Sequence, residues 1–251
     1  MRKFLILLRR EVTSYFHTPI AYVVIFYFLL LTGFNFVSAV TLMNRGPSEV
    51  TVVEAFFNTT IFWFTFVLIF PLITMRTYAE EFRLGTVEPL TTAPVRDVQV
   101  VLAKFGGSLV FYCIMWLPSV LYFVLFEAIS KESAANSAGA WGGSYLMLFL
   151  LGMFYLSIGN LASALTRDQI NAAVISFSLV SLAFFMGLLS MLLPTSTPYF
   201  QEIIRYFSAL DHMGDFSRGI IDTKPIVYYC SMTALMLFLT YHVFQYRKWK
   251  V

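Results

Sequence analysis

The residues of this chain that could do catalytic chemistry are few and scattered. The three histidines, His17, His212 and His242, are far apart in the sequence. The stretch DHMGD at 211–215 offers two carboxylates and an imidazole, but without the spacing of a known metal motif. The chain has no Ser-His-Asp order, no G-x-S-x-G motif and no G-x-x-x-x-G-K-[ST] phosphate loop. We therefore predict no catalytic residue, no metal site and no cofactor bound by this chain.

The most polar stretch in the first half of the chain is residues 79–94, AEEFRLGTVEPLTTAP. It separates two long apolar runs and carries three glutamates and an arginine. Residues 77–84 can form a short amphipathic helix. Gly85 is a natural end for that helix, because glycine enters the left-handed backbone region freely.

A second short helix is predicted in the same stretch. Thr86 can cap it, and Glu88 in its first turn suits the positive end of the helix dipole. Pro89 is tolerated in a first turn, and Pro94 ends the segment. Residues 76–97 therefore form a helix, a break and a helix. Two interpretations are open: a solvated loop, or a coupling element that transmits a partner's motion to the apolar runs on both sides.

The composition is that of an integral membrane protein. Of the 251 residues, 59% are hydrophobic and 12% are charged, whereas a soluble domain is about 25% charged. The length allows a single membrane domain, residues 1–251, with little soluble mass. The net charge is only +3, and the basic residues flank apolar runs without forming a patch, so we expect no nucleic-acid binding. Cys113 and Cys230 lie within apolar runs, which favours buried thiols over a disulfide or zinc site.

Six apolar segments are long enough to cross a bilayer, which takes about 20 residues in a helix. They are residues 19–43, 56–75, 105–126, 141–166, 170–193 and 225–246. We therefore predict an all-α polytopic fold with six transmembrane helices and both termini on one side. The segments are nearly free of charge, whereas an ion-coupled transporter normally carries intramembrane charge. This argues against a self-powered transporter or channel.

The basic residues indicate which side holds the termini, because cytoplasmic loops carry an excess of lysine and arginine. With cytoplasmic termini, the inner segments hold twelve of the 17: Arg2, Lys3, Arg9, Arg10, Arg76, Arg83, Arg96, Lys104, Arg167, Arg247, Lys248 and Lys250. The outer segments hold five: Arg45, Lys131, Arg205, Arg218 and Lys224. We therefore predict that both termini and residues 76–97 are cytoplasmic.

Residues 1–18 are predicted to form an amphipathic helix in the inner interface. One face of the helix carries Met1, Phe4, Leu5, Leu8, Val12, Tyr15 and Phe16, and the other carries Arg2, Lys3, Arg9, Arg10, Thr13 and His17. This pattern suits a helix that lies on membrane lipid with its cations toward anionic headgroups. A break before the first span is expected at Pro19, because the residue before a proline avoids the helical region.

The connection 194–224 is the longest predicted outer segment. Its apolar residues Phe200, Ile203, Ile204 and Phe207 recur at helical spacing. We predict two short helices, interrupted at Gly214 and Gly219, that re-enter the outer leaflet or cap the bundle. Re-entrant backbone must pack against protein or line a cavity. The candidate functional residues of this segment are Asp211, His212, Arg218 and Gly219.

Two motifs resemble those of the ABC type-2 exporter permease family. The pattern E-E-x-x-x-G-T-x-E-x-L is matched by Glu80, Glu81, Gly85, Thr86, Glu88 and Leu90, with Pro94 closing it. Pro89 stands where an aliphatic residue is expected, so the second helix could begin later. The stretch FSRGIID at 216–222 and the ending YRKWK resemble the permeases associated with gliding motility and with nitrous-oxide reductase maturation.

The resemblance implies a permease of a bacterial inner membrane that forms a dimer, of identical or different chains, around a translocation path. It implies a separate ATPase subunit, which binds ATP and Mg²⁺ and docks on residues 76–97. In this interpretation the docking residues are Glu80, Glu81, Arg83, Gly85, Thr86, Glu88 and Pro94. The alternative is an ATPase-independent membrane enzyme or scaffold. A lipid-modifying enzyme would cluster histidines and carboxylates at one interface, and the sequence has no such cluster.

Overall fold

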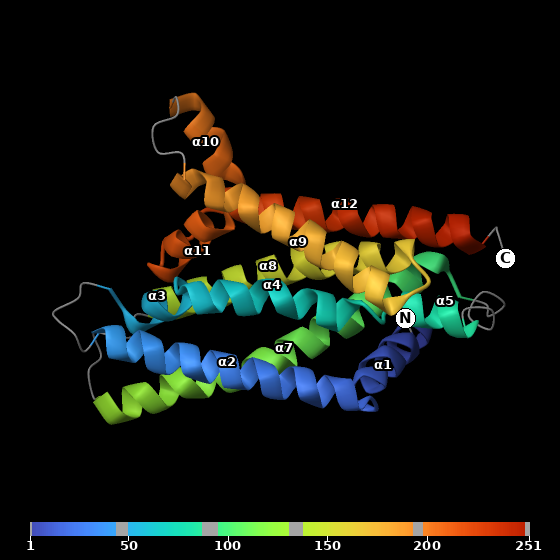
Figure 1. Cartoon of the computed structure of the whole chain (residues 1–251), viewed down its shortest axis with the longest axis horizontal. Helices are drawn as coiled ribbons and strands as arrows, with labels where there is room; N and C mark the ends of the chain where they lie inside the picture. Colours follow the sequence, from blue (N-terminus) through green and yellow to red (C-terminus); the bar gives the residue numbers. More distant parts are fainter. Residues whose placement is uncertain (1, 44–49, 87–94, 131–137, 193–197, 249–251) are drawn as a thin grey trace.

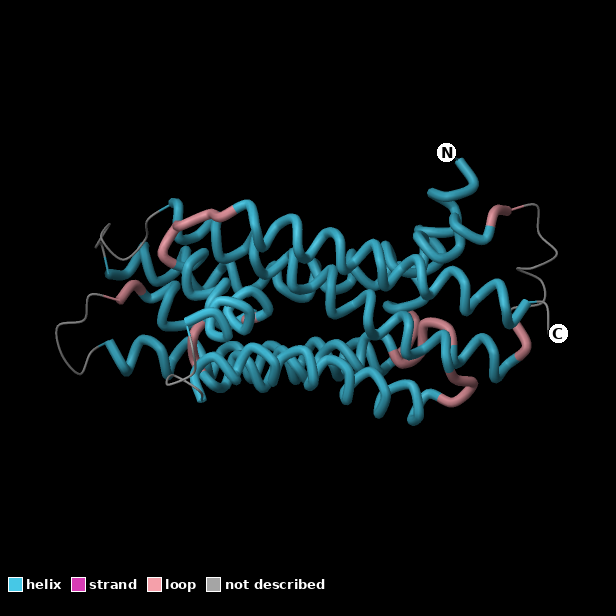
Figure 2. The backbone as a smooth tube through the Cα atoms, turned by 90° about the horizontal axis from the view of Figure 1, so that it is seen from above, coloured by secondary structure: helices cyan, strands magenta, loops and turns pink. Residues whose placement is uncertain are grey.

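The computed structural model describes residues 2–43, 50–86, 95–130, 138–192 and 198–248. These residues are almost entirely helical and contain no strand. Figure 1 shows long helices side by side along the long axis of the molecule, and Figure 2 shows the same bundle from above. Both views place the two chain ends at the same end of the bundle, which we call the termini end. The all-α fold is therefore confirmed.

Six helices in the described part of the chain are long and apolar enough to cross a membrane, which confirms the predicted number. They are α2 (Pro19–Met43), α4 (Thr60–Thr74) continued by α5 (Ala79–Leu84), α7 (Asp97–Ser130), α8 (Ala138–Leu165), α9 (Gln169–Leu192) and α12 (Thr223–Lys248). The shorter helices are α1 (Arg2–Phe16), α3 (Val52–Phe57), α10 (Pro198–Phe207) and α11 (Ala209–Ser217).

The predicted second span, residues 56–75, is not a single helix. It is broken at Asn58 and Thr59, between α3 and α4. Asn35 of α2 fills the break: its amide donates to the carbonyl oxygen of Phe56 at 3.0 Å, and its Oδ1 accepts from the Thr59 hydroxyl at 2.5 Å. The prediction missed the break because these polar side chains satisfy the backbone inside an otherwise apolar run.

The helix α8 is the centre of the bundle. In its most apolar stretch 78% of the residues are buried, against 61% for α4 with α5 and at most 33% for the other four spans. Small residues bring neighbours close to it: a Cβ on Gly159 would collide with the side chain of Thr74 on α4. The Tyr112 hydroxyl of α7 donates to the carbonyl oxygen of Leu148 at 3.0 Å. The central helix α8 therefore contacts both α4 and α7 at close range.

The helix α7 is much longer than its predicted span, residues 105–126. Its 34 residues extend for about 51 Å at 1.5 Å each, whereas the hydrocarbon core of a bilayer is about 30 Å thick. The helix is therefore longer than a single span requires. Lys104 lies in its first turns, one residue before the predicted span.

The helix α1 lies against α7 at the termini end (Figure 1). The approach is close because α7 carries two glycines there: a Cβ on Gly107 would lie 2.8 Å from Cβ of Glu11. The rings of Tyr15 and Phe111 stack with centroids 4.9 Å apart. The helix ends before Pro19, which confirms the predicted break. Its position in a membrane interface stays a prediction.

The segment between α9 and α12 contains two short helices, α10 and α11, as predicted. The predicted interruption at Gly214 is wrong, because Gly214 lies within α11. The break is instead at Ser208, whose hydroxyl oxygen accepts from the backbone N–H of Asp211 at 3.2 Å and so caps α11. The predicted interruption at Gly219 is confirmed: this glycine follows the end of α11 and has a φ of 83°. Whether these helices re-enter a membrane stays a prediction.

Candidate functional site at the α4–α5 junction

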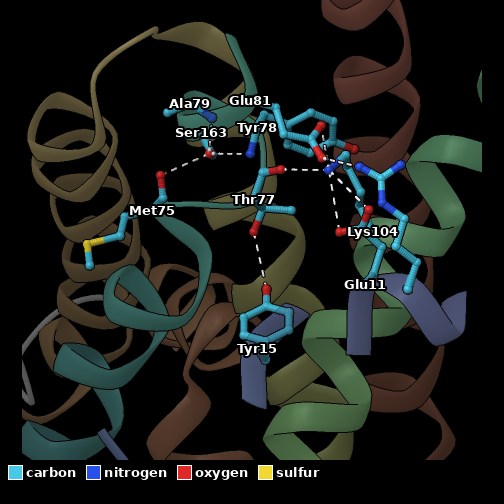
Figure 3. A network of polar contacts seen from close by, with 10 residues as sticks. Glu11, Tyr15, Met75, Thr77, Tyr78, Ala79, Glu81, Lys104 and Ser163 are labelled. Atoms are coloured by element: carbon cyan, nitrogen blue, oxygen red, sulfur yellow. Dashed lines mark hydrogen bonds and ion pairs between the residues drawn. The ribbon is translucent and has the colours of Figure 1, made fainter. Parts of the chain in front are cut away.

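A buried lysine organises the junction between α4 and α5. The Lys104 side chain of α7 is 1% exposed, and its Nζ lies 2.8 Å from Oε2 of Glu81 on α5 (Figure 3). Nζ also donates to the carbonyl oxygen of Thr77 at 2.8 Å and lies 3.4 Å from both carboxylate oxygens of Glu11 on α1. Nζ also lies over the Tyr78 ring, 5.2 Å from the ring centroid. One ammonium group therefore joins α1, α5, α7 and the junction.

The charges around Lys104 balance. Burying a charge is costly unless it is paired and hydrogen-bonded. Glu11 and Glu81 supply two negative charges against one ammonium, and Arg10 of α1 lies 3.8 Å from Glu81. The four groups are together neutral. The Glu11 and Glu81 side chains are 12% and 17% exposed, and they border a cavity of about 190 Å³, so the glutamates are in partial contact with water.

A buried serine holds the other side of the junction. The Ser163 Oγ of α8 accepts from the backbone N–H of Tyr78 at 3.0 Å and from that of Ala79 at 3.1 Å. The Ser163 hydroxyl also donates to the carbonyl oxygen of Met75 at 3.2 Å (Figure 3). A helix break leaves backbone groups without helical partners, and this single hydroxyl satisfies three of them. The junction is thereby tied to the central helix.

The junction is also tied to α1 through Tyr15. Its hydroxyl donates to the carbonyl oxygen of Ile73 at 3.3 Å and is 3.3 Å from Oγ1 of Thr77. Burial raises the pKa of Tyr15 above its usual range, so the phenol stays protonated and remains a hydrogen-bond donor. Lys104, Ser163 and Tyr15 hold the junction from three helices.

The helix α5 also contacts the end of α12. The guanidinium of Arg247 lies 4.9 Å from the centroid of the Phe82 ring. The Phe82 ring is 6.5 Å from that of Tyr78 and 6.5 Å from that of Phe244. These rings form a small second core at the termini end. The inward face of α5 is thus fully engaged by the rest of the bundle.

The predicted docking residues that the structure describes divide into inward and outward groups. Glu80 pairs with Arg76 through two contacts of 2.8 Å, and Glu81 faces Lys104. Arg83, Gly85 and Thr86 are exposed. Gly85 has a φ of 70° and ends α5, as predicted.

Two other predicted docking residues, Glu88 and Pro94, lie outside the described residues, as does the helix that Thr86 was predicted to cap. The docking role of the whole set stays a prediction. The inward role of Glu81 could not be predicted from the local pattern, because its partner Lys104 is 23 positions away on another helix.

The structure describes the candidate residues at the opposite end of the bundle, and two of them, Asp211 and Arg218, line one cavity there. His212 Nδ1 lies 3.1 Å from the Tyr229 hydroxyl, and Arg218 Nε donates to Oε1 of Glu54 at 2.7 Å. Asp211 lies in the first turn of α11. Within the described residues no group of three histidines, cysteines or carboxylates is placed to hold a metal ion.

Glu54, Lys104 and Ser163 make buried or half-buried polar contacts that sequence reasoning missed. Glu54 is part of a T-x-x-E pattern that starts at Thr51, and this pattern could have revealed the start of α3. Lys104 had only the signal of a lone cation at the edge of an apolar run. Its partners come from α1, α5 and the junction, so only the fold shows its role.

Comparison with protein families decides the identity of this bundle. The model of the family described as ABC-2 family transporter protein matches residues 37–241. The chain belongs to the ABC-2 transporter family. It is therefore a multi-pass membrane protein, as predicted from the apolar segments, and a member of a transporter family, as predicted from the motifs. A comparison with curated proteins found no match.

The match of the ABC-2 family covers the junction, Lys104 and Ser163, whereas α1 lies before its first matched residue. The partners of Lys104 therefore come both from the part that the family model matches and from an N-terminal helix outside it. The resemblance to gliding-motility and nitrous-oxide reductase maturation permeases stays a prediction.

Proposed function

We propose that this chain is the permease subunit of an ATP-driven exporter, works as a dimer and docks a separate ATPase subunit on residues 76–97. The proposal rests on membership of the ABC-2 transporter family and on one structural observation. The α4–α5 junction is held by Lys104 of α7 and Ser163 of α8 at the same time. A force applied to α5 would therefore be passed to a membrane-spanning helix and to the centre of the bundle.

The proposed coupling needs α5 to move together with the junction rather than bend away from it. The inward face of α5 is held by the Glu81–Lys104 ion pair and by Phe82. The outward face carries Arg83 and Thr86, which are exposed. We infer that the ATPase contacts the outward face, while the inward face carries the movement into the bundle. Docking and coupling would then depend on different residues.

The proposal also places both termini and α5 in the cytoplasm of a bacterial inner membrane. It is supported by the excess of basic residues in the segments assigned to that side. A single cysteine introduced at Thr86, in a chain with Cys113 and Cys230 replaced by serine, would test this. The new cysteine should react with a membrane-impermeant maleimide only after the cells are opened.

The first experiment is to purify the tagged full chain from its native host in mild detergent and identify the proteins that come with it. A stoichiometric ATPase is expected. Arg83→Glu should release it, because charges at an interface steer and align the partners. Arg205→Glu, which reverses an exposed arginine between α9 and α12, is the matched control and should retain the ATPase.

A second variant separates coupling from docking. Lys104→Met should keep the ATPase bound but lower the ATP hydrolysis that the permease stimulates, because the contact from α5 to α7 is removed. If the chain purifies alone and an ATPase encoded beside it does not bind on co-expression, the exporter proposal fails. The ATPase-independent alternative would then be preferred.

A further inference from the structure

A second polar site lies at the termini end, beside the last turns of α12. A cavity of about 540 Å³ opens between the end of α8 and the end of α12. Its lining residues are Leu165, Arg167, His242, Val243, Tyr246 and Arg247. This set joins two guanidinium groups and an imidazole to apolar side chains. The cavity does not share a lining residue with the one beside Lys104.

The two arginines of this cavity are held differently. Arg247 donates from Nη1 to the carbonyl oxygen of Thr166 at 3.0 Å and from Nη2 to that of Leu165, so its guanidinium is fixed at the C-terminus of α8. Arg167 is exposed and forms no ion pair within the described residues. The neighbouring Asp168 does not line the cavity. Two cations therefore face one space, and none of its lining residues in the described part of the chain is a carboxylate.

The position of the cavity indicates what kind of anion it suits. The candidate span in α8 ends at Leu165, and the one in α12 ends at Arg247. We therefore expect the cavity to lie where these two spans leave the hydrocarbon layer, at the depth of lipid headgroups. Its apolar wall is open: Leu165 is 46% exposed and Tyr246 is 62% exposed. A tyrosine at this depth is typical of the membrane interface.

We propose that this cavity binds the phosphate group of an anionic membrane phospholipid. Arg167 and Arg247 hold the phosphate, since guanidinium groups bind phosphate oxygens by paired, charge-assisted hydrogen bonds. Leu165, Val243 and Tyr246 contact the glycerol and the first carbons of the acyl chains. The apolar wall favours a lipid over free phosphate, and basic pockets between spans are suited to anionic headgroups.

The bound lipid would also contact the residue that links α12 to α5. The Arg247 guanidinium lies over the Phe82 ring of α5 and caps α8. A phosphate on the same guanidinium adds a partner to a side chain that already joins three helices. Binding should therefore stabilise the termini end of the bundle, and thermal unfolding can measure this effect.

The test uses the purified full chain in a neutral detergent. Phosphatidylglycerol, phosphatidylcholine with the same acyl chains, and inorganic phosphate are added in turn, and the midpoint of thermal unfolding and lipid binding by native mass spectrometry are recorded. Phosphatidylglycerol should bind and raise the midpoint. Phosphatidylcholine should not, because the two arginines repel the trimethylammonium group beside its phosphate, and inorganic phosphate should not, because it has no acyl chain to contact the apolar wall. Arg167→Gln should unfold at the wild-type midpoint without lipid and bind phosphatidylglycerol about tenfold more weakly.

The matched control is Arg96→Gln, which removes an exposed cation just before α7 at the same end of the bundle. It should bind phosphatidylglycerol as the wild type does. Equal weakening in both variants would overturn the proposal in favour of diffuse attraction to the basic end. Wild-type binding by Arg167→Gln would overturn it as well. A midpoint shift with inorganic phosphate as large as that with the lipid would show a site for soluble anions instead.

Discussion

The Nζ of Lys104 lies 2.8 Å from Oε2 of Glu81, although the two residues belong to different helices and the lysine side chain is 1% exposed. The pair connects a short helix that follows one membrane span to the first turns of the next span. Glu11 adds a third helix to the same ammonium group. The contact is therefore suited to keeping α5 in one orientation relative to the bundle.

Replacement of Lys104 by methionine should destabilise the protein. Glu11 and Glu81 would each lose their buried cation while remaining mostly shielded from water. Removing one member of a buried ion pair costs about 3–5 kcal/mol, and we expect about 3 kcal/mol because the glutamates are partly solvated. The measurement is the midpoint of thermal unfolding in detergent, with Arg9→Met on the exposed face of α1 as the control.

The double variant Lys104→Met with Glu81→Gln isolates the ion pair. The glutamine leaves no uncompensated charge on α5, so the double variant should be more stable than Lys104→Met alone. A double variant as unstable as the sum of the two single variants would show that the two residues act independently. The ion pair would then not explain the orientation of α5.

Replacement of Ser163 by alanine should loosen the junction. The backbone N–H groups of Tyr78 and Ala79 would lose a buried acceptor. An unsatisfied buried polar group costs about 1–3 kcal/mol. Ser178→Ala is the matched control, because the Ser178 hydroxyl is exposed and donates to the carbonyl oxygen of Val174 in its own helix. Equal unfolding midpoints for the two variants would contradict the role given to Ser163.

Two glycines of α8 provide a matched pair for the packing against α4. A Cβ on Gly159 would collide with the Thr74 side chain, whereas one on Gly142 would meet no atom within 4 Å. Gly159→Ala should therefore cost about 1–3 kcal/mol through overpacking. Gly142→Ala should stabilise the helix by up to about 1 kcal/mol, because alanine is the better helix former. Thermal unfolding of both variants checks the difference, and adding Thr74→Ala should restore part of the loss in Gly159→Ala.

Much of the architecture could be predicted from the sequence, because the bilayer determines how long an apolar span must be and on which side basic residues accumulate. The six spans, the break before Pro19 and the end of α5 at Gly85 all rest on local rules that need no tertiary contact. The break at Asn58 was missed, because the group that fills it is the side chain of Asn35, 23 residues earlier. Local patterns do not reveal such a distant partner.

Only part of the candidate site could be predicted, because local patterns do not reveal partners that are distant in the sequence. The E-E-x-x-x-G-T pattern identified the segment that contains α5, but it did not show that Glu80 and Glu81 have partners within the chain. Lys104 and Ser163 are single polar residues in apolar helices, where their types alone indicate no function. Their role depends on the approach of α7 and α8 to the junction, which the packing of the whole bundle determines.

The buried histidine of α11 should make stability depend on pH. Burial lowers the pKa of His212, Arg205 lowers it further, and the nearby carboxylates of Asp211, Asp215 and Asp222 oppose the shift only in part. In the unfolded chain the histidine takes up a proton below pH 6.5 or so, whereas in the folded protein it stays neutral beside the Tyr229 hydroxyl.

Below about pH 6.5 the unfolded state thus binds more protons than the folded protein. The stability that is present above this pH is therefore lost as the pH falls toward the lower pKa of His212 in the folded protein. The unfolding midpoint of the wild type should therefore fall between pH 7.5 and pH 5.5. In His212→Gln, which retains a polar side chain without the titration, the fall should be smaller. A variant with the full wild-type fall would assign the pH dependence to other groups, and His212 would then be only a packing residue between α11 and α12.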